Sequence, residues 1–328
     1  MTECVDNDIR YMRRALQLAR GGELHASPNP MVGAVITARG RIIGEGFHRR
    51  CGEGHAEVNA VNSVKERQLL KEATVYVTLE PCSHYGKTPP CAKLLIDSGV
   101  KRVVIGSPDP FPLVAGRGEA MLREAGIEVT TGVLENECKA LNRKFMTAHT
   151  LGRPFITLKW AQSADGFMDW KRANDGKACK FSTPLTSVIV HRMRAVHDAI
   201  MVGSGTFMAD TPALTVRHWG GNDPRRIVMD RSGILSDVPS EWLHITGKET
   251  LAETLHNLYE RDKITSILVE GGPMLLNSFL SENIWDAARI EKAPFMLGNK
   301  GDKTAPTINR LPDSTCTIDN REILLYHN

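Results

Sequence analysis

The chain has 328 residues, of which 41% are hydrophobic and 24% charged, and its net charge at neutral pH is +3. This composition is typical of a globular protein with one large domain or two ordinary ones. It argues against a membrane protein, because no run of about 18 apolar residues occurs. It also argues against a nucleic-acid-binding protein, because no basic tail or run of Lys and Arg is present.

The first 20 residues predict an amphipathic helix with Met12, Leu16 and Ala19 on one face. They lack the apolar region of a secretory signal. The chain has seven cysteines at uneven spacing, which without such a signal favours a reducing cytoplasm. We therefore expect a cytoplasmic protein. Only Cys82 and Cys91 stand in a sequence context that indicates a site.

Strand and helix patterns alternate along the first half of the chain. Strands are predicted at 31–37, 41–47, 74–80, 101–107 and 127–133, and helices at 55–66, 91–99 and 116–126. The first two strands form a predicted hairpin around residues 38–40. Such alternation predicts an α/β sandwich around a largely buried sheet.

The alternation is interrupted at Gly152 and Pro154, and a new strand pattern begins at Phe155. We therefore predict two domains, at 1–150 and 151–328. In the second domain strands are predicted at 155–161, 199–204, 225–230, 266–272 and 289–297, and helices at 186–198, 249–262 and 273–284. This half is also predicted to have an α/β fold.

A candidate metal site lies in the first half. Cys82 and Cys91 frame the segment PCSHYGKTPPC, and His55 with Glu57 form the upstream H-A-E motif. Zinc is commonly bound by Cys and His, and a catalytic site uses three protein ligands and keeps a position for water. The pattern H-x-E with P-C-x-x-C is typical of zinc nucleobase deaminases, but here eight residues separate the two cysteines. Three ligands, His55, Cys82 and Cys91, are therefore predicted, and His84 is the one nearby candidate for a fourth.

Several motifs together resemble a known enzyme family. They are PNPMVGAVI, GEGFH, HAEVNAV, TVYVTLEPCSHYGKTPPC and AGRGEAMLREAGIEV in the first half, and KWAQSADG, MVGSGTFMADTPALTVR and VEGGP in the second. They look like the bifunctional deaminase–reductase family of riboflavin biosynthesis, and the resemblance covers nearly the whole chain. In that family the longer cysteine spacing is normal. The resemblance implies a cytidine-deaminase-like α/β/α sandwich followed by a dihydrofolate-reductase-like α/β domain.

For the first domain, the resemblance implies a zinc-activated water that attacks a phosphorylated ribosylaminopyrimidine. Glu57 would carry the proton from the water to the ring and to the departing ammonia. Asn29, His84 and Lys87 match positions that hold the substrate, and a lysine suits a phosphate as a compact charge. Asn29 between two prolines could equally be a turn residue, and Lys87 a solvated one. His25 and His48 are expected to be structural or at the surface.

In the second domain no G-x-G-x-x-G fingerprint follows a strand, so a Rossmann motif is not indicated. The resemblance implies NADPH as cofactor. A glycine turn that enters a helix suits an anion, but it is a weak signal by itself. The matching cofactor positions are Ala161, Thr206, Asp210, Gly272, Pro273, Met274, Leu275, Leu276, Asn277 and Ser278. The matching substrate positions are Lys159, Arg194, Leu214, Arg217 and Glu270. Hydride transfer would open the ribosyl ring to a ribityl chain.

The sequence departs from the family pattern in a few places. Lys180 stands where the family has a tryptophan beside the cofactor, and Ser182 where it has a threonine. Phe111 replaces an expected amide, and the segment 233–250 is shorter than the family pattern predicts. These departures concern the reductase half more than the deaminase half.

Three alternatives stay open from the sequence. The chain could be a deaminase with a degenerate reductase half, a deaminase of a tRNA base, or a zinc-stabilised binding protein with a closed four-ligand site. The tRNA deaminase predicts a basic surface and the short cysteine spacing, and neither is present. We expect a small-molecule phosphorylated pyrimidine as substrate, Zn²⁺ and NADPH as cofactors, no nucleic-acid or membrane partner, and a homo-oligomer.

Overall fold

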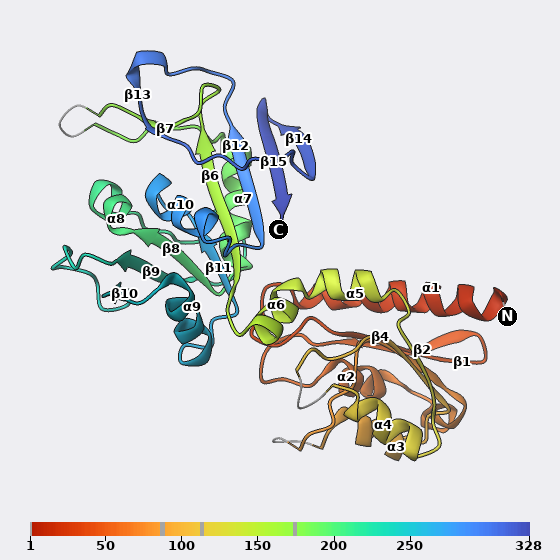
Figure 1. Cartoon of the computed structure of the whole chain (residues 1–328). Helices are drawn as coiled ribbons and strands as arrows, with labels where there is room; N and C mark the ends of the chain where they lie inside the picture. Colours follow the sequence, from red (N-terminus) through yellow and green to blue (C-terminus); the bar gives the residue numbers. More distant parts are fainter. Residues whose placement is uncertain (1, 86–88, 112–114, 173–175) are drawn as a thin grey trace. The chain divides into compact units, whose positions relative to one another are not determined.

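The structure is a computed structural model, which describes residues 2–85, 89–111, 115–172 and 176–328. The chain divides into two compact units, Met1–Leu151 and Gly152–Asn328. Each unit has its own sheet (Figure 1). No helix among the described residues is long and apolar enough to cross a bilayer.

The first unit is a three-layer sandwich around a five-stranded sheet in the order β2-β1-β3-β4-β5. Its strands are β1 (Gly33–Ala38), β2 (Arg41–Phe47), β3 (Thr74–Leu79), β4 (Arg102–Ser107) and β5 (Glu128–Thr131). Its helices are α1 (Thr2–Ala19), α2 (Ala56–Ser63), α3 (Cys91–Asp97), α4 (Arg117–Glu124), α5 (Glu135–Leu141) and α6 (Arg143–Leu151), with 3-10 turns η1 (Arg20–Gly22) and η2 (Arg67–Glu72). β1 pairs antiparallel with β2 and β3, while β3, β4 and β5 are parallel. The predicted α/β/α sandwich is confirmed.

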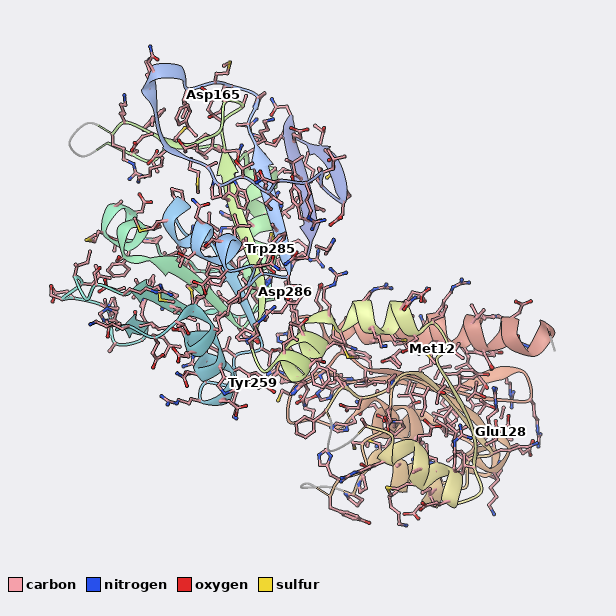
Figure 2. All side chains as sticks on the ribbon, in the orientation of Figure 1. Met12, Glu128, Asp165, Tyr259, Trp285 and Asp286 are labelled. Carbon is pink, nitrogen blue, oxygen red and sulfur yellow. The ribbon has the colours of Figure 1, made fainter. Side chains whose placement is uncertain are left out.

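The two faces of this sheet bury different helices. On one face α1 packs through Met12 and Leu16 against Val35, Tyr76 and Val104 (Met12 is labelled in Figure 2). On the other face α2, α3 and α4 cover a core of aliphatic side chains from β1, β3 and β4. The apolar face predicted for the first helix is confirmed, since Met12, Leu16 and Ala19 are all buried.

The second unit is built on an eight-stranded sheet in the order β10-β9-β8-β11-β6-β12-β15-β14. Its strands are β6 (Phe155–Gln162), β8 (Ala199–Gly203), β9 (Arg225–Asp230), β10 (Leu243–Thr246), β11 (Ser266–Val269), β12 (Ala287–Lys292), β14 (Ser314–Ile318) and β15 (Arg321–His327), and β7 (Phe167–Trp170) pairs with β13 (Gly301–Thr304). Its helices are α7 (Pro184–Ala195), α8 (Ser204–Asp210), α9 (Leu251–Glu260) and α10 (Pro273–Ser281), with the 3-10 turn η3 (Gly298–Lys300). The strands from β10 to β12 are parallel, β15 is antiparallel to β12, and β14 is antiparallel to β15.

Strand alternation separates the two faces of this sheet. Trp160 and Ile290 lie in the core formed with α9 and α10. The opposite face carries α7, whose Thr186 bonds to Glu291 of β12. Trp285 and Asp286, both labelled in Figure 2, precede β12. Asp286 accepts two hydrogen bonds from Arg153 and one from the N–H of Ile156.

The structure corrects some of the predicted elements. Residues 143–151, which we did not assign to an element, form α6, in which Ala148 is buried and Phe145 packs against His149 one turn later. The strand predicted at 289–297 ends at Lys292, since Pro294 has no N–H to continue the pairing. The strand predicted at 266–272 ends at Val269, and the short segment 233–250 contains β10.

Candidate active sites

The three predicted metal ligands lie together in the first unit. One ligand atom from each of His55, Cys82 and Cys91 lies within 4.8 Å of the others. Nδ1 of His55 is 3.7 Å from Sγ of Cys82 and 3.4 Å from Sγ of Cys91. Two thiols and an imidazole nitrogen form a donor set that suits Zn²⁺ with one position left for water. Among the described residues this is the one such cluster.

Local structure positions each ligand. His55 is the N-cap residue of α2, in extended conformation, and Cys91 is the first residue of α3. Cys82 follows β3, and its sulfur accepts a hydrogen bond of 3.3 Å from the N–H of Cys91. The start of a helix stabilises a thiolate, because its N–H groups lack intrahelical partners.

The electrostatics of the triad favour metal binding. Hydrogen bonds from the thiol of Cys91, from His55 and from the N–H of Cys91 lower the pKa of Cys82 to about 4, against the effect of burial. The hydrogen bond to Cys82 and burial raise the pKa of Cys91, so the two sulfurs share one negative charge. The hydrogen bond to Cys82 also raises the pKa of His55. A Zn²⁺ ion would replace the shared protons and neutralise both thiolates.

Glu57 lies two residues beyond His55 in the first turn of α2 and is 3% exposed. Burial, followed by the charge of Cys82, raises its pKa to about 7. A carboxyl with this pKa can both accept and release a proton near neutrality.

Asn29 and His48 form an unexpected pair beside the triad. Nδ2 of Asn29 is 3.1 Å from Nε2 of His48, whose Nδ1 is 3.2 Å from the carbonyl oxygen of Gly54. Burial lowers the pKa of His48, so the neutral ring donates to Gly54 and accepts from Asn29. The His48 and His55 rings meet edge to face at 5.5 Å. We expected His48 to be structural or at the surface, and the structure shows it buried and in contact with a predicted substrate residue. No spacing rule in the sequence indicates this contact.

The segment between Cys82 and Cys91 contains two predicted substrate-binding residues, His84 and Lys87. His84 is exposed, and its charge acts on the pKa of Asp109. Lys87 lies outside the described residues. His84 shares no contact with the triad that would make it a fourth ligand.

Glu80 holds the segment that leads to Cys82. Its buried carboxylate accepts hydrogen bonds from four backbone N–H groups, those of Asp109, Gly116, Gly118 and Glu119, at 2.9–3.3 Å. A Cβ on Gly118 would come within 2.0 Å of the Pro81 carbonyl oxygen, so α4 approaches this segment too closely for any other residue. The start of α4 therefore fixes the backbone beside Cys82.

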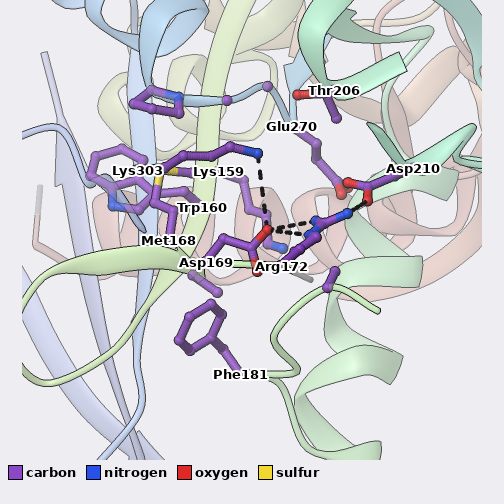
Figure 3. Close-up of a pocket in the computed structure, with 15 residues that line it drawn as sticks. Lys159, Trp160, Met168, Asp169, Arg172, Phe181, Thr206, Asp210, Glu270 and Lys303 are labelled. Atoms are coloured by element: carbon purple, nitrogen blue, oxygen red, sulfur yellow. Dashed lines mark hydrogen bonds and ion pairs between the residues drawn. The ribbon is translucent and has the colours of Figure 1, made fainter. Parts of the chain in front are cut away.

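The second unit has a cavity of about 200 Å³ (Figure 3). It lies where β6, β8 and β11 end and where α8 and α10 begin. Ligands of α/β proteins bind at this carboxyl edge of a parallel sheet. Seven of its lining residues were predicted as cofactor or substrate residues: Lys159, Ala161, Thr206, Asp210, Glu270, Gly272 and Pro273. The cavity size suits a single ring, such as a nicotinamide.

The substrate candidates Arg194 and Glu270 form a bidentate ion pair, with Nε–Oε1 at 3.0 Å and Nη2–Oε2 at 2.8 Å. Burial would raise the pKa of Glu270, but Lys159 and Arg194 lower it overall. Burial lowers the pKa of Lys159, followed by the charge of Arg289, while Glu270 and Glu291 oppose this. This site therefore combines a charged carboxylate with an amine that loses its proton more easily than a surface lysine.

The loop around Leu214 and Arg217 is tied to α7. Nη1 of Arg194 donates to the carbonyl oxygen of Thr215 at 3.2 Å, and the N–H of Arg217 donates to Nδ1 of His191 at 2.9 Å. Arg217 is exposed, whereas the side chain of Leu214 lies in the core at φ 53°. Leu214 therefore offers a ligand only its backbone.

In the predicted cofactor segment 272–278, at the start of α10, some residues have groups free to contact a ligand and others do not. Gly272 is the N-cap and Pro273 the first helical residue, so the free N–H groups belong to Met274 and Leu275. The side chain of Leu276 lies in the core and its N–H bonds to Gly272, so it has no group for a cofactor. Asn277 is exposed, and the hydroxyl of Ser278 bonds to the Met274 carbonyl oxygen.

Sequence reasoning missed several residues of the cavity wall. Arg172 bridges Asp169 and Asp210, with contacts of 2.6 Å to each, and Lys303 lies 3.9 Å from Asp169 (Figure 3). They come together because β7 pairs with β13, more than a hundred residues later. No local pattern indicates that pairing.

Two residues that depart from the family pattern, Lys180 and Phe111, can be located in the structure. Lys180 is exposed and takes no part in the cavity, whose wall here is formed by Phe181 and Ala178. Phe111 meets His149 edge to face at 5.8 Å. Neither departure places a charge inside a described site.

These two sites define a class: a zinc-binding deaminase unit joined in one chain to a reductase-type α/β unit. The comparisons agree with this class. Residues 5–107 match the cytidine and deoxycytidylate deaminase zinc-binding region, and residues 154–313 match the RibD C-terminal domain. Riboflavin biosynthesis protein RibD of Aquifex aeolicus is 40% identical, over 89% of this chain and 88% of that protein. RibD of Escherichia coli strain K12 is 38% identical, over 94% of each.

Solved structures give the same result. Acinetobacter baumannii RibD has a TM-score of 0.89 at 32% identity, covering 98% of this chain and 99% of that one. A Thermotoga maritima diaminohydroxyphosphoribosylaminopyrimidine deaminase/5-amino-6-(5-phosphoribosylamino)uracil reductase has a TM-score of 0.85 at 36% identity, with the same coverage.

The chain belongs to the RibD family of riboflavin biosynthesis proteins. The predicted fold class, the bifunctional deaminase and reductase activities, and the dependence on Zn²⁺ and NADPH are confirmed.

Proposed function

We propose that this enzyme deaminates a diaminopyrimidinone ribosyl phosphate at the site of His55, Cys82 and Cys91, and then reduces the ribosyl group of the product in the cavity of the second unit. The observation that carries the proposal is the convergence of these three ligands beside the buried Glu57. The cavity at the carboxyl edge of the second sheet, lined by seven predicted residues, supports the reductase half.

In the deaminase site, bound Zn²⁺ would supply the positive charge that activates water for attack on the ring carbon. Glu57 would take one proton from the attacking water to the ring nitrogen, and would then take the second proton, from the added hydroxyl, to the amine, so that the carbon–nitrogen bond breaks, ammonia leaves and a carbonyl forms. Asn29 would bind the pyrimidine through its amide, since His48 accepts a hydrogen bond from its Nδ2 and leaves its oxygen free. His84 and Lys87 would hold the polar end of the substrate.

In the reductase site, bound NADPH would supply the hydride for the first carbon of the ribosyl group. As the carbon–oxygen bond of the ring breaks, its electron pair stays on the oxygen, which takes a proton. Lys159 is the candidate donor, because its amine lines the cavity. Arg194 and Arg217 would bind the phosphate, and Asp210 and Thr206 the cofactor.

We propose that the partners are small molecules and that the enzyme acts in the cytoplasm as a homo-oligomer, without nucleic acid. The sequence has no run of basic residues, which supports small-molecule partners rather than nucleic acid.

The test uses the zinc-loaded full chain and the diaminopyrimidinone ribosyl phosphate, with and without NADPH, with product masses as readout. We expect loss of one amino group without NADPH and a further gain of two hydrogens with it. Glu57→Gln should abolish ammonia release but leave reduction of an added deaminated substrate intact. Lys159→Met should do the reverse. Full deamination by Glu57→Gln would disprove its role, and deamination without any reduction would disprove the reductase half.

A further inference from the structure

A row of buried and half-buried charges lies on the α7 face of the second sheet, at the reductase cavity. Arg289 of β12 pairs in register with Lys159 of β6, and residues paired in register point to the same face of a sheet. Glu270 follows Val269, which pairs with Leu158, so Glu270 lies on the other side of Lys159. Glu291 lies two residues beyond Arg289 on the same face.

The outer members of the row are paired and Lys159 is not. Glu270 is held by both nitrogens of Arg194, and Glu291 accepts from Arg289 at 3.2 Å and from Thr186 at 2.7 Å. Within the described chain, no hydrogen bond or ion pair of Lys159 is found. Its amine therefore stands between two pairs that already satisfy each other.

The pair on β12 is unusually buried. Arg289 is 5% exposed and Glu291 is 0% exposed. Nη2 of Arg289 is buried without a hydrogen-bond partner among the described residues. An arginine kept in a core with an unsatisfied nitrogen costs stability, so a functional reason for it is expected. Arg289 is not among the residues that line the cavity, so it is not expected to contact a ligand there.

We propose that Arg289 and Glu291 are positioning residues of the reductase site, whose two charges beside the Lys159 amine set how readily it gives its proton to the substrate. Arg289 is the in-register neighbour of Lys159 on β12, and the repulsion between the two positive charges favours release of the Lys159 proton. Glu291 limits this repulsion and, through Thr186, anchors the pair to the start of α7.

The charges around Lys159 come from every element that packs against it. They are Glu270 after β11, Arg289 and Glu291 of β12, Arg194 and His191 of α7, and Asp169, Arg172, Asp210 and Lys303 around the cavity. Arg194 with Glu270 and Arg289 with Glu291 sum to zero, which leaves the charge of Lys159 uncompensated. The lowered pKa of Lys159 agrees with this geometry.

The test compares two variants that remove charges of opposite sign. Arg289→Met removes a positive charge and should shift the titration of Lys159 to higher pH, whereas Glu291→Gln should shift it to lower pH, each by about one pH unit. Arg289→Lys keeps the charge and should resemble the wild type. The double variant Arg289→Met with Glu291→Gln removes both charges and should return close to the wild-type value.

Two readouts follow the same group. One is the alkaline limb of the pH profile of the reductase rate, which reports loss of the donated proton. The other is the ¹³C chemical shift of Lys159 after reductive methylation with labelled formaldehyde, with the signal assigned by its absence in Lys159→Arg. Thermal melting and NADPH binding of each variant verify the fold, and Glu291→Gln alone decides the sign if Arg289→Met does not fold.

Opposite shifts in the two single variants support the proposal. An unchanged titration of Lys159, or shifts of the same sign in both, would overturn it and leave the pair a purely structural one. The effect on proton donation rests on the proposed reductase function, but the role of the pair and the reductase function can be refuted separately. The ¹³C titration tests the electrostatic role even if no reduction occurs, and a wild type that reduces its substrate while the titration stays fixed refutes only the role of the pair.

Discussion

The carboxylate of Glu80 provides the sharpest test of how the deaminase site is held. Glu80→Gln keeps the shape of the side chain and one oxygen, but it turns the NH₂ group toward two of the four backbone N–H donors. If the oxygen that stays is Oε1, the donors left without an acceptor belong to Asp109 and Gly116. At about 1.5 kcal/mol for each charge-assisted bond, the first unit should lose about 3 kcal/mol of unfolding free energy.

Urea unfolding of the full chain, followed by a probe in the first unit, measures this loss. Deaminase activity should fall with it, because Cys82 lies two residues from Glu80, whereas oxidation of NADPH by the second unit should stay at the wild-type rate. Glu72→Gln is a matched control, because Glu72 forms an exposed ion pair with Arg39 and should change stability by less than about 0.5 kcal/mol. A Glu80→Gln protein as stable as this control would refute the reasoning.

Three further outcomes are expected. Removing zinc with a chelator should abolish ammonia release and leave NADPH binding unchanged, and deamination at the full rate in chelated protein would contradict the site. Arg153→Ala should lower the unfolding free energy of the second unit by about 3 kcal/mol in urea, because it leaves the largely buried Asp286 without its ion-pair partner. A loss no larger than that caused by the exposed Arg39→Ala would contradict this. Hydrogen bonds from Ser163 and from backbone N–H groups lower the pKa of Asp165 to about 2, so its stabilisation is complete above about pH 4 and is lost as the pH falls toward 2. The difference in melting temperature between wild type and Asp165→Asn should therefore shrink over that interval, and a constant difference would contradict it.

The sequence was informative wherever a local pattern and a local contact coincide. The hairpin of β1 and β2 follows from two apolar runs around Arg39 and Gly40, and Gly46 marks the strand that lies directly on α2, where a Cβ would come within 2.3 Å of the Ala60 nitrogen. The cluster of His55, Cys82 and Cys91 was predicted from the sequence because a histidine, a glutamate and two cysteines in that order are typical of a zinc site.

The remaining features depend on contacts between distant segments. β13 and β14 carry polar, exposed residues, so no apolar alternation identifies them, and they form only because β7 and β15 offer partners. Lys303 reaches the cavity by the pairing of β13 with β7. Arg289 and Glu291 look like solvated charges in the sequence, and only the register of β12 with β6 reveals that both are buried.

That register has a consequence for folding. Side chains alternate between the faces of a strand, so a slip of one residue between β6 and β12 would turn Arg289 and Glu291 into the aliphatic core beneath α9 and α10, and bring Ile290 to the α7 face. Burying these two charges in the aliphatic core would cost free energy, so they favour the register between β6 and β12 that the structure shows.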